Sequence, residues 1–343
     1  MKVGLVYDPI YLKHDTGGHV ENARRLEAVL AHLEQTGLKA KLTEIEPRPA
    51  TTEELCLVHE EQHVFHIQGA AEGGGGWLDG DTVMSADSYQ AATYAAGGAI
   101  RATEAVMDGK VDSAFALVRP PGHHATPWRA MGFCLFNNLA IATRYALAKY
   151  HLERILIIDF DVHHGNGTQE IFYEEPRVLY ISTHQFPLFP GTGYIDEIGS
   201  GEAKGTTLNI PLPPGCGDRE YEMVFTRIIM PAARRFQPQL IMVSAGYDAH
   251  WAGKLALMQV STTGFARMVK IIRELADELR SGNLVFCLEG GYNPDALAAS
   301  VKATLDVLRG ETSLEDRLGQ PPQPLLAADI TPLIKAIKEI HTL

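Results

Sequence analysis

Short apolar runs rich in β-branched residues recur along the chain, separated by longer segments whose apolar positions have helical spacing. Such runs are typical of buried strands, and we expect them at Val3–Tyr7, Ala114–Val118, Ile155–Asp159, Val178–Ser182, Leu240–Ser244 and Leu284–Leu288. Helices are expected at Glu21–Glu34, Ala86–Met107, Asn138–Lys149, Arg219–Arg235, Thr263–Leu279 and Asp295–Leu308. This alternation predicts an α/β fold with a single open, mostly parallel β-sheet flanked by helices on both faces.

Three segments are expected to be long loops, namely His14–His19, Gly73–Asp81 and Phe186–Gly205. Gly73–Asp81 is too rich in glycine for regular structure. Long loops are usually surface connections, but beside an active site they often form its rim.

The C-terminal part has a different pattern. Gly319–Pro324 is typical of a linker, and Thr331-Pro332 can start a helix with apolar residues on one face. We therefore expect one domain over residues 1–318. Residues 319–343 would form a linker and a helix that packs on the domain or on a neighbouring subunit, so a homo-oligomer is an open possibility.

Composition excludes several classes of function. The chain of 343 residues has 30 Lys and Arg against 42 Asp and Glu, a net charge of −12, whereas a nucleic-acid-binding protein would have a basic footprint. The 4 cysteines show no CxxC spacing, which favours reduced thiols in a cytoplasmic protein. The first residues read as a strand, not as a signal peptide, and no apolar run could span a bilayer. We expect no nucleic-acid or membrane partner.

Polar motifs directly follow five of the predicted strands. They are Arg119–His124, Asp159–His164, Ser182–His184, Ala245–Asp248 and Glu289–Tyr292. Ligands of open parallel sheets bind outside the carboxyl ends of the strands, so these segments would meet at one site. This placement predicts an enzyme.

One of these motifs suggests a metal site. Asp159, Asp161 and His163 would point the same way if the chain stays extended, and a divalent cation would relieve the repulsion between the buried carboxylates. Asp248 could complete a site of two aspartates and one histidine. Three protein ligands with an open position are typical of a catalytic metal. Alternatively, Asp248 only caps the next segment.

The pair His123-His124 follows two prolines and a glycine, which favour a tight turn. Two imidazoles beside a metal could supply acid–base catalysis near neutral pH. Asp159 and Asn166 are candidate partners, and the charged partner would raise the basicity of its histidine more than the neutral one. Alternatively, both histidines are structural or exposed.

Aromatic residues in the same loops could shape the site. Tyr292 follows two glycines, and its phenol could stabilise an oxyanion. Gly132-Phe133 and Phe189 could wall a narrow tunnel for an alkyl chain. Ordinary core packing is the alternative for all three aromatic residues.

Three further histidines have helical spacing but no carboxylate partners. His59, His63 and His66 are therefore expected to form a solvated or supporting face rather than a ligand set.

Taken together, these segments resemble the histone deacetylase family of zinc hydrolases, which have the arginase/deacetylase fold. The match reaches from the N-terminal region to about Leu308. The motifs that carry it are Arg119–Ala125, Met131–Asn138, Asp159–Gly167, Phe189–Gly193, Ala245–His250 and Leu288–Tyr292. In having asparagine at position 166, the chain resembles the class II enzymes and their bacterial relatives, the histone deacetylase-like amidohydrolases and acetylpolyamine amidohydrolases, whereas class I enzymes have aspartate there.

The resemblance implies a role for each site residue. Zinc would be held by Asp161, His163 and Asp248. His123 would pair with Asp159, His124 with Asn166, and Tyr292 would be the transition-state tyrosine. The tunnel residues would be Gly132, Phe133, Phe189 and Leu255. A structural potassium ion would be bound by backbone oxygens of Asp159 and His163 together with Asp161 and Ser182.

The mechanism is implied as well. Zinc and His123 would activate water, zinc and Tyr292 would stabilise the tetrahedral oxyanion, and His124 would protonate the leaving amine. Hydroxamates would inhibit the reaction.

The expected substrate is acyl-lysine in peptides or proteins. The main alternative is an acetylpolyamine, but Leu255 occupies the position where polyamine-selective members carry an acid, and Lys254 would repel a polyamine. A ureohydrolase would need a two-manganese site, which Asn166 disfavours. A non-catalytic acyl-lysine binder is disfavoured by the two histidines and Tyr292.

Overall fold

The computed structural model describes residues 1–279, 282–311 and 316–343. It contains an eight-stranded sheet in the order β2-β1-β5-β10-β9-β6-β7-β8, in which every neighbouring pair is parallel. The strands are β1 Val3–Val6, β2 Thr43–Ile45, β5 Ser113–Ala116, β6 Ile155–Asp159, β7 Val178–Gln185, β8 Thr207–Leu212, β9 Leu240–Ala245 and β10 Leu284–Leu288. The predicted parallel α/β sheet is confirmed.

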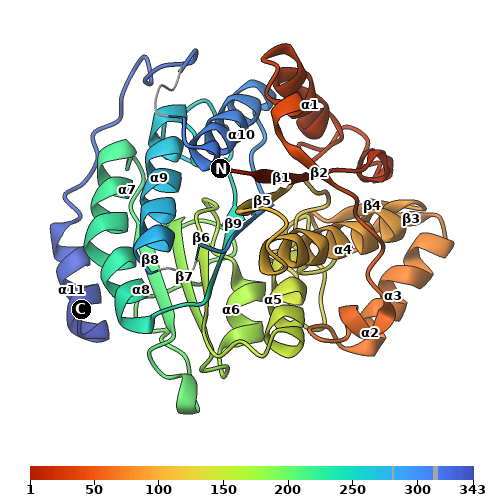
Figure 1. Cartoon of the computed structure of the whole chain (residues 1–343), viewed down its shortest axis with the longest axis horizontal. Coiled ribbons are helices and arrows are strands. Elements are labelled where there is room, and N and C mark those ends of the chain that lie inside the picture. Colours follow the sequence, from red (N-terminus) through yellow and green to blue (C-terminus); the bar gives the residue numbers. More distant parts are fainter. Residues whose placement is uncertain (280–281, 312–315) are drawn as a thin grey trace.

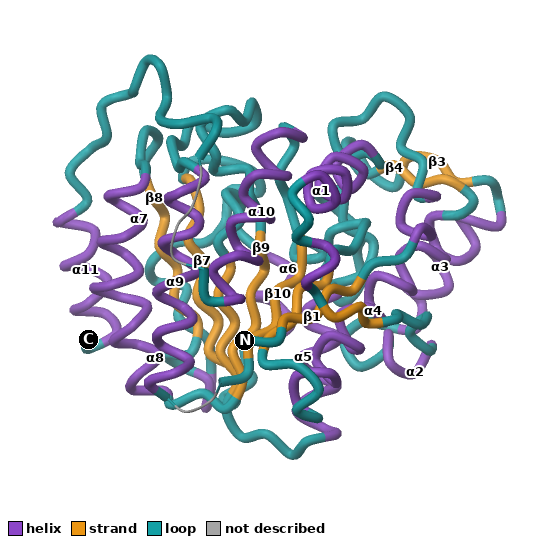
Figure 2. Tube along the Cα trace, turned by 45° about the horizontal axis from the view of Figure 1, so that its top comes forward, coloured by secondary structure: helices purple, strands orange, loops and turns teal. Residues whose placement is uncertain are grey.

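Helices cover both faces of this sheet (Figures 1 and 2). They are α1 Arg24–Gln35, α2 Thr52–Leu55, α3 Glu61–Glu72, α4 Ser88–Met107, α5 Asn138–Lys149, α6 Asn166–Phe172, α7 Asp218–Val224, α8 Met230–Phe236, α9 Thr262–Glu278, α10 Pro294–Arg309 and α11 Thr331–His341. Helix α4 packs on β1, β5 and β10, and α5 packs on β9. On the other face α10 contacts both α1 and α9. Within the described residues, no helix is both long and apolar enough to cross a membrane.

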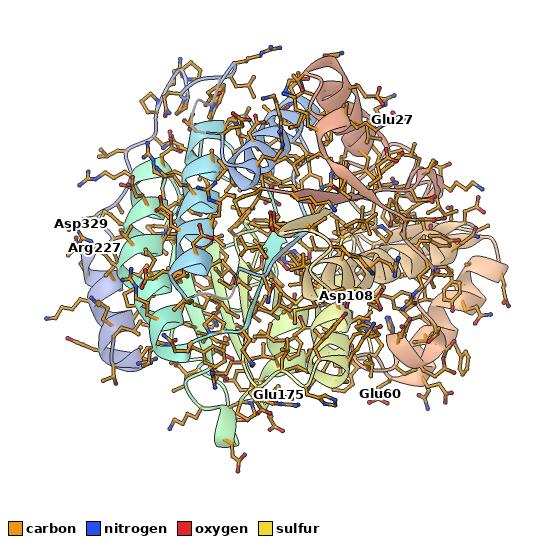
Figure 3. All side chains as sticks on the ribbon, viewed as in Figure 1. Glu27, Glu60, Asp108, Glu175, Arg227 and Asp329 are labelled. Carbon is orange, nitrogen blue, oxygen red and sulfur yellow. The ribbon has the colours of Figure 1, made fainter. Side chains whose placement is uncertain are left out.

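Burial follows the expected pattern, because the strands are apolar and enclosed between the helices. Every residue of β1, β5, β6, β7, β9 and β10 is buried. Charged side chains such as Glu27, Glu60, Arg227 and Asp329 lie at the periphery (Figure 3). The buried charged groups discussed below are therefore exceptions that need partners.

The sequence predicted the long elements best. Each of the six predicted strands is present, with ends that differ by at most three residues. Two short edge strands, β2 and β8, were missed. Strand β8 includes Pro211, which an edge strand tolerates because it donates no hydrogen bond to a further neighbour.

The prediction for Gly73–Asp81 was wrong, because part of this segment forms a hairpin. Strand β3 Gly75–Trp77 pairs antiparallel with β4 Val83–Ser85. Gly75 has φ of 89°, and a Cβ there would lie 2.2 Å from the Met84 carbonyl oxygen. Glycine is thus what allows the two strands to approach, not a sign of irregular structure.

The predicted helix Arg219–Arg235 is also interrupted. A π-helical turn, Phe225–Ile229, separates α7 from α8. Pro231 has no N–H to donate to the preceding turn, which explains why regular α-helical bonding cannot run through this point.

Helix α11 lies against the same chain. Ile334 and Ile337 are buried, the helix contacts the π-helical turn, and Arg235 donates to the carbonyl oxygens of His341 and Thr342. The division of the chain at residue 318 stays a prediction.

Candidate active site

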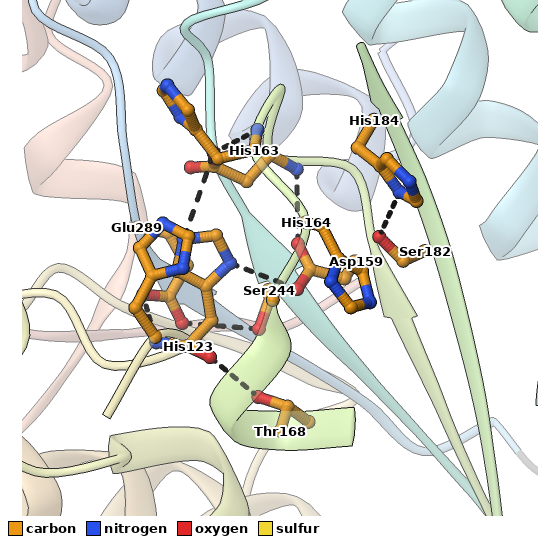
Figure 4. Close-up of polar contacts among 12 residues, drawn as sticks. His123, Asp159, His163, His164, Thr168, Ser182, His184, Ser244 and Glu289 are labelled. Carbon is orange, nitrogen blue, oxygen red and sulfur yellow. Dashed lines mark hydrogen bonds and ion pairs between the residues drawn. The ribbon is translucent and has the colours of Figure 1, made fainter. Parts of the chain in front are cut away.

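The site lies at the carboxyl ends of five adjacent strands, β5, β10, β9, β6 and β7. A polar motif begins at or after the end of β5, β10, β9 and β6, whereas Ser182–His184 lies within the last part of β7, so residues far apart in sequence converge at one edge of the sheet. The register aligns them, since Asp159 lies opposite Ser244 on one side and Ser182 on the other. The close-up in Figure 4 shows how these side chains face one another.

Asp161, His163 and Asp248 form a buried group suited to a metal ion. Their ligand atoms all lie within 4.8 Å of one another. Nδ1 of His163 is 3.1 Å from Oδ1 of Asp161 and 3.1 Å from Oδ2 of Asp248. Tetrahedral zinc with nitrogen and oxygen ligands at about 2.1 Å would separate these atoms by roughly 3.4 Å. The donor set and its spacing therefore fit zinc.

Backbone groups hold both carboxylates in place. Gly290 N donates to Oδ2 of Asp161 over 2.8 Å, and Val162 N donates to Oδ1 of Asp248 over 3.0 Å. A Cβ at Gly290 would come within 2.3 Å of Asp248 Oδ2 and 2.5 Å of Asp161 Oδ2. The glycine after β10 is thus needed for the chain to approach this close.

Asp159 does not join this group, which corrects one expectation. Strand β6 ends at Asp159, and the chain then bends, with Asp161 N donating to Asp159 Oδ1 and His163 N to Asp161 Oδ1. The extended geometry that would align Asp159, Asp161 and His163 therefore ends at Asp159. The alternative that Asp248 only caps a helix does not fit either, because its carboxylate faces His163 and Val162 N.

The two adjacent histidines have the partners that the sequence suggested. Nδ1 of His123 is 3.1 Å from Asp159 Oδ2, and Nδ1 of His124 is 2.9 Å from Asn166 Oδ1. Both rings are buried. Burial opposes the charged form of His123, but the Asp159 and Asp161 carboxylates outweigh it and raise its pKa to about 10.

His124 has the opposite balance. Burial, with further contributions from His123 and His163, holds its pKa well below the usual range. The charged and neutral partners thus separate the two histidines in basicity, as expected.

The aromatic ring of Tyr292 lies next to these groups and is held in place by packing. Its ring meets Phe133 edge-on at 5.6 Å, and the Arg25 guanidinium lies 5.0 Å from the ring centre. Burial, with Asp248 nearby, raises the pKa of the phenol well above its usual value. The hydroxyl therefore stays protonated at neutral pH and can act as a donor.

The predicted tunnel residues lie at different depths. Phe189 meets His124 edge-on at 5.1 Å, and Phe133 meets Tyr292, so these two aromatics flank the site. A Cβ at Gly132 would lie 2.4 Å from the His124 ring. Leu255 is 36% exposed, on the segment between β9 and α9, and its part in the tunnel stays a prediction.

The predicted potassium residues lie beside the metal group. Ser182 is on β7 opposite Asp159, and its Oγ is 2.9 Å from Nδ1 of His184. Potassium binding at Asp159, Asp161, His163 and Ser182 stays a prediction.

Of the two roles expected for these three histidines, His59 and His63 have the supporting one and His66 the solvated one. His59 and His63 are buried, and only His66 is exposed. Nδ1 of His59 lies 2.9 Å from the Thr126 carbonyl, and its Nε2 accepts from Asn137 N. Nε2 of His63 lies 2.9 Å from the Leu135 carbonyl. These two histidines support the loop that carries Phe133.

Sequence reasoning missed three buried residues that surround the site. Tyr180 donates toward Asp159 Oδ2, Arg25 donates to the carbonyls of Glu289 and Gly291, and the Glu289 carboxylate contacts the His123 backbone. Arg25 and Glu21 are four residues apart on what reads as a helix, and Glu289 directly follows a strand. These positions were visible, but nothing in the sequence identified their partners.

Comparisons with known proteins agree on one family. Residues 19–308 match the sequence model of the histone deacetylase domain. A probable deacetylase from Archaeoglobus fulgidus is 44% identical over 296 residues, which cover 85% of this chain and 82% of that protein. A histone deacetylase-like amidohydrolase from Pseudomonas aeruginosa is 40% identical over 297 residues, covering 86% and 78%.

A solved structure gives the same result. The HDA15 HD domain superimposes with a TM-score of 0.90 at 35% identity, covering 99% of this chain and 94% of that one.

Proposed function

Because the chain belongs to the histone deacetylase family, we propose that it is a zinc-dependent enzyme that removes acetyl or other acyl groups from the ε-amine of lysine in peptides or proteins. Hydrolysis of an amide by a deacetylase or amidohydrolase follows from the family itself. The observation that carries the finer proposal is the buried group Asp161, His163 and Asp248 beside two histidines and Tyr292.

Asp161, His163 and Asp248 would hold the zinc ion, and the histidine pair lies beside them. A zinc ion there supplies Lewis acidity toward the scissile carbonyl and a positive charge that opposes the carboxylates' effect on the pKa of His123. The structural potassium ion predicted beside this group is part of the same proposal.

The side chains then divide the proton transfers among them. His123, oriented by Asp159, accepts a proton from the attacking water. The Tyr292 hydroxyl donates a hydrogen bond to the carbonyl oxygen, and this bond strengthens as that oxygen gains negative charge. His124, oriented by Asn166, donates a proton to the leaving amine; because this imidazole is neutral in the resting site, that proton is the one that His123 took from water. The products are the peptide with a free lysine ε-amine and acetate or another carboxylate.

The rim favours a peptide over a polyamine. Leu255 and Lys254 are both exposed there, and neither offers the negative charge that would attract a polyamine. Acetylpolyamine deacetylation is therefore the second candidate and an outcome of the test below. A ureohydrolase or a non-catalytic binder is less consistent with this set of side chains.

The test is turnover of zinc-loaded protein on an acetyl-lysine peptide and on acetylspermidine, side by side, with and without a hydroxamate. We expect hydroxamate-sensitive release of acetate from the peptide and little from the polyamine. Preference for acetylspermidine would replace the proposed substrate. An inactive parent that still binds the peptide would support the binding role instead. The His124→Ala variant serves as the catalytic control and should be slower by roughly 100-fold or more.

A further inference from the structure

Glu289 is a fully buried carboxylate that the mechanism above does not use. It directly follows β10, and none of its surface reaches solvent. Its Oε2 accepts from Gly122 N at 2.7 Å and from His123 N at 3.2 Å, and its Oε1 accepts from Ser244 Oγ at 3.2 Å. Figure 4 shows Glu289 between His123 and Ser244. One side chain thus joins the ends of β10 and β9 to the histidine segment.

We propose that Glu289 is a positioning residue, whose carboxylate fixes the backbone of the segment that carries His123 and His124. The inference rests on the proposed function, since it assigns the histidine pair its task. His123 is then held by Asp159 at its ring, by Glu289 at its backbone N–H and by Thr168 N at its carbonyl oxygen. Glu289 is the one of these three that also binds Gly122, and so it fixes the backbone from which both histidines project.

The sequence of this segment explains why an outside acceptor is needed. Pro120 and Pro121 have no N–H, so Gly122 and His123 carry the first backbone donors after Arg119. Both donors go to Glu289. The segment has no strand partner here, because β5 ends at Ala116.

The position of His124 depends on the same anchor. Ala125 N donates to the Gly122 carbonyl, closing a tight turn around the histidine pair. A shift at Gly122 would therefore move His124 relative to Asn166. A misplacement of about 1 Å can cost roughly 100-fold in rate.

Glu289 also relates this segment to the oxyanion side of the site. Its neighbour Gly290 donates to Asp161, and Tyr292 follows three residues later. Arg25 fixes the same segment, because its guanidinium donates to the carbonyl oxygens of Glu289 and Gly291. The histidine pair, the proposed metal ligand Asp161 and Tyr292 are thereby all connected to one short segment, Glu289–Tyr292.

The charge on Glu289 has opposing influences. Burial raises its pKa to about 7, while His123 and the Gly122 N–H act to lower it. Hydrogen bonds to an ionised carboxylate are roughly twice as strong as neutral ones, so a glutamine in its place should hold the segment, but less firmly.

The experiment compares Glu289→Ala, Glu289→Gln and a matched control, Glu104→Gln. Glu104 is also buried, at 7% exposed. It lies on α4, away from the site, and accepts hydrogen bonds from Lys149 and Tyr145 on α5. Turnover of acetyl-lysine peptide is measured per bound zinc. We expect kcat to fall roughly 100-fold in Glu289→Ala, less in Glu289→Gln, and not at all in Glu104→Gln, with KM within about twofold throughout.

Hydrogen exchange gives a second readout that does not need activity. Amides of peptides spanning residues 119–125 should exchange faster in Glu289→Ala and, to a smaller extent, in Glu289→Gln, but at the parent rate in Glu104→Gln. If Glu289→Ala does not fold, Glu289→Gln decides. Parent-like exchange and parent-like kcat in the folded Glu289 variant would overturn the proposal. An inactive parent would contradict the proposed function alone, and exchange would still test the anchor.

Discussion

At the scale of single residues, the groups that surround each buried histidine of the site determine its protonation state. His163 faces two carboxylates, which raise its pKa to about 10 despite burial. Burial, with His123 and His163 nearby, lowers the pKa of His124, and the Asn166 amide opposes this shift only in part. Without metal, His163 is therefore favoured as a cation and His124 as a neutral imidazole, and zinc must displace a proton from His163 when it binds.

Replacement of Tyr292 by Phe tests the oxyanion role at this scale. The ring is fixed by Phe133 and Arg25, and within the described residues its hydroxyl has no hydrogen-bond partner, so Phe should keep the packing and remove only the donor. We expect kcat to fall roughly 100- to 1,000-fold, with bound zinc unchanged. Steady-state kinetics and metal analysis of the same preparation check this. An unaltered kcat would assign the oxyanion to another donor.

At the scale of elements, helix α3 has a task that its spacing did not reveal. His63 on α3, and His59 in the turn before it, lie against the carbonyl oxygens of Leu135 and Thr126 in the loop that leads to and from Phe133. Burial, with a smaller effect from His63, lowers the pKa of His59 from the ordinary 6.5 to about 3. The folded chain therefore keeps this imidazole neutral where the unfolded chain would protonate it.

The consequence is a stability that depends on pH. Because the folded-state pKa lies below the unfolded one, the unfolded chain binds more protons between pH 6.5 and pH 3, and stability falls as the pH decreases through this range. The contribution of His59 amounts to roughly 2 kcal/mol between pH 6.5 and pH 5. His59→Gln should therefore destabilise the protein less at pH 5 than at pH 7, by about that amount.

Denaturant unfolding at both pH values measures this difference. His66→Gln, at an exposed position on α3, which begins two residues after His59, is the matched control and should unfold like the parent at each pH. Equal destabilisation by His59→Gln at pH 7 and pH 5 would show that His59 is not kept neutral in the folded state.

The elements also show how far the sequence could be read. Long strands and their terminal motifs were predictable, because apolar runs need burial and polar residues at their ends need a common site. The β3–β4 hairpin was not, since Gly75 in isolation looks like a loop residue and only the approach of Met84 explains it. Burial of His59 and the partners of Glu289 depend on residues about 70 and 170 positions away, which no local pattern contains.

At the scale of the whole molecule, the candidate metal group is buried at the carboxyl ends of neighbouring central strands. Asp161 and Asp248 are 1% and 3% exposed, on loops that follow the neighbouring strands β6 and β9. A bound cation would therefore stabilise the fold as well as the reaction, because the folded chain alone brings these ligands together.

Removal of zinc should lower the thermal unfolding temperature. At a free zinc concentration 1,000 times Kd, the ion would contribute about 4 kcal/mol to the free energy of unfolding. Differential scanning calorimetry before and after chelation measures this, and added zinc should restore the original temperature. Asp248→Asn is the matched control, because a variant with a weakened site should respond little to zinc. Identical unfolding of parent with and without zinc would contradict a metal site here.

The order of the sheet has a consequence for synthesis on the ribosome. Strand β10, the last to be made, lies in the middle of the sheet between β5 and β9. A nascent chain that has not reached residue 284 can form β2-β1-β5 and β9-β6-β7-β8 only as separate halves, each with an open edge. The interval before β10 emerges is thus when the chain is most exposed to aggregation and most in need of a chaperone.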